Sequence, residues 1–369
     1  QAVVVEGAGD EFLARAALAV DEDRGVGGGD LAEGFDEAER FFNIAIEKDP
    51  NYAAPWAGLA SLWVSRLQLN MARREEGLVK AKSAVLKALG LDDGEIEARR
   101  VMAGILTWLD WDWRAAEQAW NRLFEIDPDN ASALPGYAHF LMVMGRMDEA
   151  ITKSERAMEL DPYNVRTQSF HAQVLYHARR FDEAIAMARK VLNAQPGNGV
   201  AQSALKDSLF MKGMLDDLLA SLRDRWSRDP ELSKAMMQGF AEGGFAGASK
   251  RLADAQAARF GKPGGMAGYA LAHLYVYAGE RGRVIEWLEK AYEAHDNNLP
   301  YLRAPDLDLV RDDPRFHDLV RRDDEVLLGL LDRHARELVG EGADLVLGAE
   351  LVLERRLGLV LVLHPDVHE

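Results

Sequence analysis

Apolar and small residues recur at a fixed spacing in the middle of the chain, between residues 97 and 230. The large apolar residues Leu141, Leu175 and Leu209 stand 34 positions apart. Other columns keep the same spacing: Gly104, Ala138 and Ala172; Trp113, Met147, Phe181 and Leu215; Ala116, Ala150, Ala184 and Leu218. Small residues let two helices approach closely, and the large ones fill the space between neighbouring pairs. The pattern therefore predicts a repeated pair of packed helices.

Proline follows the same period, because Pro128, Pro162, Pro196 and Pro230 are also 34 residues apart. Proline lacks a backbone donor and disfavours helical geometry in the residue before it, so each should mark the end of a second helix. A period of 34 residues with these columns is typical of the tetratricopeptide (TPR) repeat. We expect an all-α, right-handed superhelical solenoid of about seven helical hairpins, the first incomplete, over residues 35–322.

The repeats vary toward both ends of this region. A helix should begin at Asp36 and end at Lys48, and helices over 52–66 and 75–89 should follow with an insertion of about ten residues between them. Residues 231–264 keep the repeat length, with the stretch Gly243-Gly244-Phe245-Ala246-Gly247 at the turn. Residues 299–322 should form a short closing unit, in which Pro305 and Pro314 punctuate two brief helices.

The two ends of the chain differ in composition from the repeats. Residues 1–34 contain no Lys, Ser, Thr or Asn, and residues 323–369 contain no Lys, Ser, Thr, Asn or Gln. We interpret 1–34 as an irregular lead-in and 323–369 as a low-complexity tail. Our hypothesis is that neither is a native flank, and that both are GC-rich coding sequence read out of frame. The start at Gln1 indicates a fragment of a longer protein.

Charge and composition exclude several classes of function. The 369 residues carry a formal net charge of −17 with a pI near 5.1, and there is no cysteine. An acidic chain lacks the Lys and Arg excess that neutralises phosphates, so this segment should not bind nucleic acid. No apolar run reaches the roughly 18 residues that a membrane helix needs, so we expect no membrane insertion. We expect a cytoplasmic location, or a periplasmic one if the parent protein carries an upstream membrane helix.

The sequence shows no catalytic constellation. None of the nine histidines forms a His-Glu-x-x-His pair, and there is no Gly-x-Ser-x-Gly motif. Three tryptophans near residue 110 suggest a carbohydrate platform as an alternative, but Trp113 occupies a core column and Asp112 is placed to cap a helix. We expect no enzymatic activity, no cofactor and no metal site.

Three motifs carry a more specific resemblance. They are Asp110-Trp111-Asp112-Trp113 with Ala116-Glu117 beyond; Tyr269–Gly279 leading into residues 286–292; and residues 306–316 at the end of the array. With these motifs the chain resembles the C-terminal TPR region of bacterial signalling proteins. There such arrays follow winged-helix, class III adenylate cyclase or Ser/Thr kinase domains. The resemblance implies a regulatory module, and as an alternative the regulatory part of such an enzyme or transcriptional regulator whose effector domain lies upstream.

A stack of helical hairpins offers a concave surface lined by its first helices. From the spacing, we expect this partner-binding groove to contain Trp108, His139, Met142, Gln173, Tyr176, His177, Asp207, Phe210, Met211, His273 and Tyr277. The Lys/Arg/Asn clamp of TPR domains that hold acidic C-terminal peptides is absent. The groove should therefore bind an apolar or amphipathic segment of a protein partner. Two alternatives remain: these residues pack only against adjacent helices or the closing unit, or the groove mediates self-association.

Overall fold

The computed structural model describes residues 30–68, 71–262 and 265–322. Within these residues the regular structure is helical and there is no β-strand. None of the described helices combines the length and hydropathy required of a membrane span. The hypotheses about residues 1–29 and 323–369 lie outside the described part of the chain.

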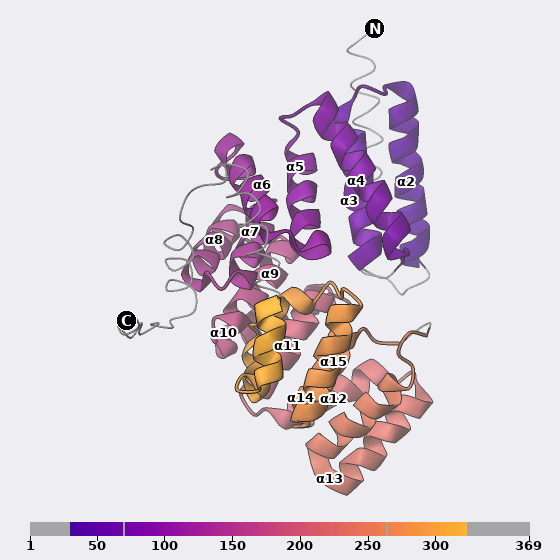
Figure 1. The fold of residues 1–369 in the computed structure, drawn as a ribbon, viewed down its shortest axis with the longest axis vertical. Helices are drawn as coiled ribbons and strands as arrows, with labels where there is room; N and C mark the ends of the chain where they lie inside the picture. The colour runs from indigo at the N-terminus through magenta and orange to yellow at the C-terminus, as the bar shows by residue number, and fades with distance from the viewer. Residues whose placement is uncertain (1–29, 69–70, 263–264, 323–369) are drawn as a thin grey trace, which may run out of the picture.

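The helices pair into consecutive hairpins (Figure 1). After α2 (Asp30–Lys48), the pairs are α3 (Ala53–Gln68) with α4 (Arg74–Leu91); α5 (Ile96–Gly104) and η2 (Ile105–Asp110) with α6 (Trp113–Ile126); α7 (Leu134–Val143) with α8 (Met147–Leu160); α9 (Val165–His177) with α10 (Phe181–Ala194); α11 (Gly199–Met211) with α12 (Leu215–Trp226); the two halves of α13 (Pro230–Ala257); and α14 (Gly268–Tyr277) with α15 (Arg281–Glu293). The predicted all-α array of about seven helical hairpins is confirmed.

The columns found in the sequence form the core of the array. The alanines at the second-helix positions 116, 150 and 184 are fully buried. The leucines at positions 141, 175 and 209 are at most 2% exposed. Helix starts are capped as expected, because the carboxylate of Asp112 accepts a hydrogen bond of 3.0 Å from the backbone N–H of Ala115. One detail differs. Pro230 does not follow a helix directly but occupies the first turn of α13, where its missing N–H is harmless.

The N-terminal hairpin differs from the expectation in two respects. Helix α2 begins at Asp30 rather than Asp36, although it ends at Lys48 as predicted. Helix α3 extends to Gln68 and α4 begins at Arg74, so extra residues of the following repeat lengthen both helices. The extension of α3 past Arg66 has a packing reason: Leu67 is buried against Gly77 of α4.

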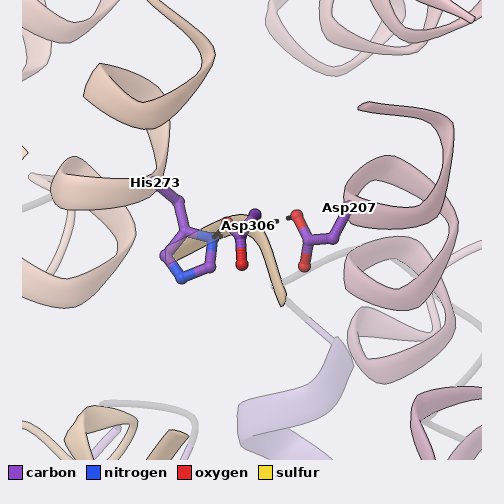
Figure 2. Close-up of side chains that lie close together, drawn as sticks. All are labelled: Asp207, His273 and Asp306. Carbon is purple, nitrogen blue, oxygen red and sulfur yellow. Dashed lines mark ion pairs between the residues drawn. The ribbon is translucent and has the colours of Figure 1, made fainter. Parts of the chain in front are cut away.

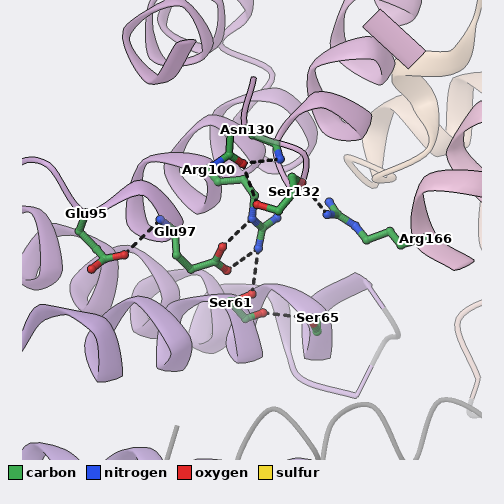
Figure 3. A network of polar contacts seen from close by, with 9 residues as sticks. Ser61, Ser65, Glu95, Glu97, Arg100, Asn130, Ser132 and Arg166 are labelled. Carbon is green, nitrogen blue, oxygen red and sulfur yellow. Dashed lines mark hydrogen bonds and ion pairs between the residues drawn. The ribbon is translucent and has the colours of Figure 1, made fainter. Parts of the chain in front are cut away.

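A polar network ties the second hairpin to its neighbours (Figure 3). The guanidinium of Arg100 on α5 donates to both carboxylate oxygens of Glu97, at 2.7 and 2.5 Å, and to the hydroxyl of Ser61 on α3 at 3.3 Å. Arg166 on α9 donates to the carbonyl of Ser132 at 3.0 Å. A guanidinium has five donors in a rigid fork, so one arginine can join two helices.

The end of the array returns to its beginning. Trp111 and His295 both have left-handed backbone conformations, with φ of 58° and 50°, and their rings stack with centroids 3.6 Å apart. Nε2 of His295 lies 3.0 Å from the carbonyl oxygen of Leu109, and Arg74 donates to Asn297 at 2.9 Å. The turn after α15 therefore contacts the second hairpin, almost 190 residues earlier in the chain.

The closing unit does not simply cap the last hairpin. Its first part consists of two short 3₁₀ helices, η3 (Leu299–Tyr301) and η4 (Pro305–Val310), and residues 314–322 are α-helical. The two prolines begin helical segments as predicted. Helix η4 contacts α11, α14 and α15, so the segment of residues 299–310, here called the closing segment, lies across the inner side of the array (Figure 1).

The turn of the sixth hairpin depends on two pairs of glycines. Gly243 and Gly244 break α13, and Gly244 has φ of +59°, as expected for the predicted turn. The two halves then cross at Gly239 and Gly247. A Cβ atom on Gly239 would lie 2.1 Å from the carbonyl oxygen of Gly247, which is far inside van der Waals contact.

We therefore predict that Gly239→Ala lowers the free energy of unfolding by about 1–3 kcal/mol, because the backbone must move to admit the methyl group. Gly90→Ala in α4 is the matched control, since a Cβ there meets no atom within 4 Å. The control should leave stability unchanged or raise it by up to about 1 kcal/mol through helix propensity. Urea denaturation measures both. Equal stability of the two variants would show that the crossing is not close.

Candidate functional site

The residues expected to line the groove are not open to solvent. His139, Met142, Tyr176, His177, Asp207 and Tyr277 are buried, and Trp108, Gln173, Phe210, Met211 and His273 are half-buried. The closing segment contacts His139, Tyr176, His177 and His273 of this surface, which agrees with the alternative that these residues pack against the closing unit. Their binding of a partner stays a prediction. The structure brings eight of the eleven residues into three neighbouring groups: a carboxylate cluster, a pair of histidines and an apolar cavity. Trp108 contacts His139, whereas Met142 and Gln173 belong to none of these groups.

The carboxylate cluster is centred on Asp306 of η4, which is 3% exposed. The hydroxyl of Tyr176 on α9 donates to Oδ1 of Asp306 at 2.6 Å, and the backbone N–H of Asp306 donates back to that hydroxyl at 3.3 Å. Nδ1 of His273 on α14 lies 2.7 Å from Oδ2 of Asp306. One side chain of the closing segment thus joins two first helices of the array.

A second carboxylate completes the cluster. Oδ1 of Asp207 on α11 lies 3.9 Å from Nδ1 of His273 and accepts a hydrogen bond from the hydroxyl of Tyr277. Figure 2 shows the side chains of Asp207, His273 and Asp306 converging from three separate elements. The cluster therefore places two carboxylates around one imidazole, with tyrosine hydroxyls donating to both carboxylates.

The pKa values follow from burial opposed by these contacts. Burial raises the pKa of Asp207, and the neighbouring charge of His273 only partly offsets this. For Asp306 the same burial is outweighed by His273 and by the Tyr176 hydrogen bond, so its pKa is lowered. Burial alone would lower the pKa of His273, but Asp306 raises it overall. Near neutral pH the cluster therefore favours a charged Asp306 and a protonated His273.

The histidine pair lies beside the cluster and behaves differently. Burial lowers the pKa of His139 to about 3 and that of His177 to about 4, so both are neutral. The ring of His139 stacks on Phe170 with centroids 4.2 Å apart, and Tyr301 of the closing segment contacts both histidines. These two histidines act as apolar packing surfaces under the closing segment.

An apolar cavity of about 430 Å³ remains where the closing segment ends. Its walls come from α11, the second half of α13, α14 with its C-terminal turn, and η4. The lining residues are Phe210, Met211, Ala246, Val276, Tyr277, Ala278, Gly279, Pro305, Asp306, Asp308 and Leu309. Three residues of the predicted groove, Phe210, Met211 and Tyr277, therefore line the part of the inner surface that remains hollow.

Sequence reasoning missed the residues supplied by the closing segment. The sequence places Asp306 only in the motif at residues 306–316, and Tyr301 lies outside every predicted column. The signal was present, because Asp306 and Asp308 are acidic positions within an otherwise apolar stretch, Pro305 to Val310. What could not be read from the periodicity was that this stretch folds back over the first helices, since it lies outside the repeat columns.

We predict that Tyr176→Phe lowers the free energy of unfolding by about 1–3 kcal/mol, because a buried carboxylate loses a donor. Tyr163→Phe is the matched control, since the Tyr163 side chain is 86% exposed. Urea denaturation should show the loss for the first variant alone. An unchanged midpoint for Tyr176→Phe would contradict the central place given to the Asp306 contact.

We predict that stability falls as the pH is lowered from 7 to 5. A histidine whose folded pKa is depressed takes up a proton in the unfolded chain below about pH 6.5 but not in the folded one, at a cost of up to about 1.4 kcal/mol per pH unit. The pKa values of His139 and His177 are both lowered in the folded chain, so these two histidines reduce its stability as the pH falls. His273 has the opposite sign: its raised pKa adds stability that is present below pH 6.5 and lost as the pH rises through the folded pKa.

The test is the melting temperature of the wild type and of His139→Phe between pH 5 and 7.5. Phenylalanine keeps the stacked ring over Phe170 but cannot take up a proton. The variant should lose less stability on acidification than the wild type. If it keeps the full slope of the wild type, His139 does not contribute to the acid sensitivity.

Comparison with known proteins agrees with the helical-hairpin fold and goes no further. No protein-family model matches the chain, and no curated protein matches its sequence. Among solved structures, a tetratricopeptide repeat protein from Parabacteroides merdae ATCC 43184 has 16% identity and a TM-score of 0.37, covering 83% of this chain and 98% of its own. PilW, described as a widely conserved type IV pilus biogenesis factor, has 19% identity and a TM-score of 0.40, covering 68% and 96%.

A third similar structure is YrrB, described as a TPR protein with an unusual peptide-binding site. It has 19% identity and a TM-score of 0.31, and the match covers 53% of this chain and 90% of that one. All three identities are below 25% and all three TM-scores are below 0.5. The likeness therefore carries no argument about function, and the site of this chain is interpreted from its own residues.

Proposed function

We propose that the chain is a protein-interaction module that binds an apolar segment of a partner in the cavity between α11, α13, α14 and the closing segment. The main support for this proposal is the cavity of about 430 Å³ on the inner side of the array, which is lined almost wholly by apolar side chains. Cavities of this size take a few side chains of a peptide rather than a whole helix. The proposed binding site is therefore smaller than the predicted groove and comprises only its part near Phe210.

The composition of the walls supports an adaptable, apolar recognition site. Phe210 and Met211 are half-buried, so their side chains still present surface to the hollow. Methionine is flexible and polarisable and adjusts to different partner shapes. Asp306 and Asp308 lie at the edge of the same cavity. With a net charge of −17 on the chain, a partner segment carrying Lys or Arg beside its apolar residues is favoured over an acidic one.

Non-catalytic function is part of this proposal. The described residues provide no nucleophile paired with a base in the cavity, and its two carboxylates belong to the closing segment. A second proposal, the regulatory part of a bacterial signalling protein that acts in the cytoplasm, is supported by the motif at residues 306–316. Asp306 and Phe316 of that motif are both buried contacts of the closing unit. Reading the coding sequence upstream of Gln1 tests it, and an open frame without an effector domain would count against it.

We predict that a phage-displayed library of random 12-residue peptides, selected on the full chain, yields sequences enriched in large apolar residues flanked by Lys or Arg. Binding of a selected peptide, measured by fluorescence anisotropy, should weaken at least about tenfold in Met211→Asp, because a carboxylate in the cavity wall must be desolvated. Half-burial of Met211 makes this change tolerable for the fold.

The matched control is Met237→Asp, since Met237 is 62% exposed and lies on α13 away from the cavity lining. It should bind the selected peptides as the wild type does. Selection of no peptide, or equal loss in both variants, would refute the proposed binding cavity.

A further inference from the structure

We propose that Asp207, His273 and Asp306 form a binding site for one divalent transition-metal ion, with Zn²⁺ the ion that fits best. The ion would join α11, α14 and the closing segment at one point. Each of the three residues offers one ligand atom, and these atoms all lie within 4.8 Å of one another. The proposal does not depend on peptide binding in the neighbouring cavity.

The donor set and its spacing suit such an ion. Two carboxylates and one imidazole are ligands that Zn²⁺ accepts, at roughly 2.0–2.2 Å each, with a fourth position left for water. Tetrahedral ligands at that distance are separated by roughly 3.4 Å. The distances from Nδ1 of His273 to Oδ2 of Asp306 and to Oδ1 of Asp207 are 2.7 and 3.9 Å, one below and one above this value. Side-chain adjustments of less than about 1 Å would therefore make room for the ion.

The hydrogen bonds around the cluster leave ligand positions free. Oδ2 of Asp306 has no hydrogen-bond partner among the described residues, and it faces Nδ1 of His273 at 2.7 Å in an ion-pair contact. Tyr176 and Tyr277 donate to the carboxylates from outside. In metal sites such outer donors hold the ligating carboxylates in place. Figure 2 shows both carboxylates and the imidazole directed toward a common space.

Charge balance points the same way. Two carboxylates are buried in one cluster, and buried carboxylates are costly unless they are paired or coordinate a metal. A divalent ion bound to a neutral imidazole would balance both carboxylates. The other ionisable groups around the cluster are Lys206, His177, Tyr176, Tyr269 and Tyr277.

The cavity provides an entry path. Its lining includes Asp306 and Tyr277, so it opens directly beside the cluster. The side chain of Asp207 is 12% exposed, and that of His273 is 13% exposed. An ion can therefore reach the ligands without unfolding of the closing segment, which is a requirement for reversible binding to the folded chain.

The test is isothermal titration of the full, chelator-treated chain with Zn²⁺, and separately with Mn²⁺ and Mg²⁺, at pH 7.5. We expect one saturable Zn²⁺ site per chain, with affinity falling from Zn²⁺ to Mn²⁺ to Mg²⁺. Saturating Zn²⁺ should raise the melting temperature by a few degrees, since the ion binds only the folded arrangement. Absence of saturable Zn²⁺ binding by the wild-type chain would overturn the proposal.

Variants locate the site. Asp306→Asn and His273→Phe should each weaken Zn²⁺ binding at least about tenfold and abolish the rise in melting temperature. Asp312→Asn is the matched control: Asp312 follows the same 3₁₀ helix, but its side chain is 77% exposed and pairs with Arg281 outside the cluster. It should bind Zn²⁺ as the wild type does. Because wild-type affinity in both His273→Phe and Asp306→Asn would place the ion elsewhere on the chain, that result would also overturn the proposal.

Discussion

The inner side of this array depends on the burial of one carboxylate, that of Asp306. A charge at this depth is tolerated only when it is paired and hydrogen-bonded, and Tyr176 and His273 meet that requirement from two different helices. The requirement works in both directions. Tyr176 and His273 are themselves polar groups on a surface that the closing segment removes from water, so they need Asp306 as much as it needs them. The closing segment and the array therefore specify each other's position.

The contact of Asp306 with Tyr176 and His273 helps to bury the inner surface of the repeats. The first helices of a helical-hairpin array usually present a concave surface, yet here His139, His177 and Tyr277 are buried beneath residues of the same chain. The stacking of Trp111 on His295 adds a second long-range contact at the other edge of the array. Together they join the closing segment to α9 and the turn after α15 to the second hairpin, so the curvature is held by contacts as well as by the repeat geometry.

The remaining hollow and the polar cluster share a wall. Asp306 and Tyr277 contribute to both, so charge in the cluster and occupancy of the cavity act on the same side chains. In the low-dielectric interior, a change of charge at His273 or Asp207 would be felt at Asp306 with little screening. The shape of the cavity and the attachment of the closing segment are therefore physically linked, because both depend on where the η4 backbone lies.

The sequence by itself determined the class of fold, the repeat length and most helix positions, because each repeat buries its own columns of Ala and Leu through local contacts. It also located the glycine turn in α13 and the cap at Asp112. It did not determine that α2 begins at Asp30, since helix starts outside the periodic columns carry weak signals. Only the tertiary structure decided that the predicted groove is covered, because the pairing of Asp306 with Tyr176 joins residues 130 positions apart and no periodic pattern encodes such a contact.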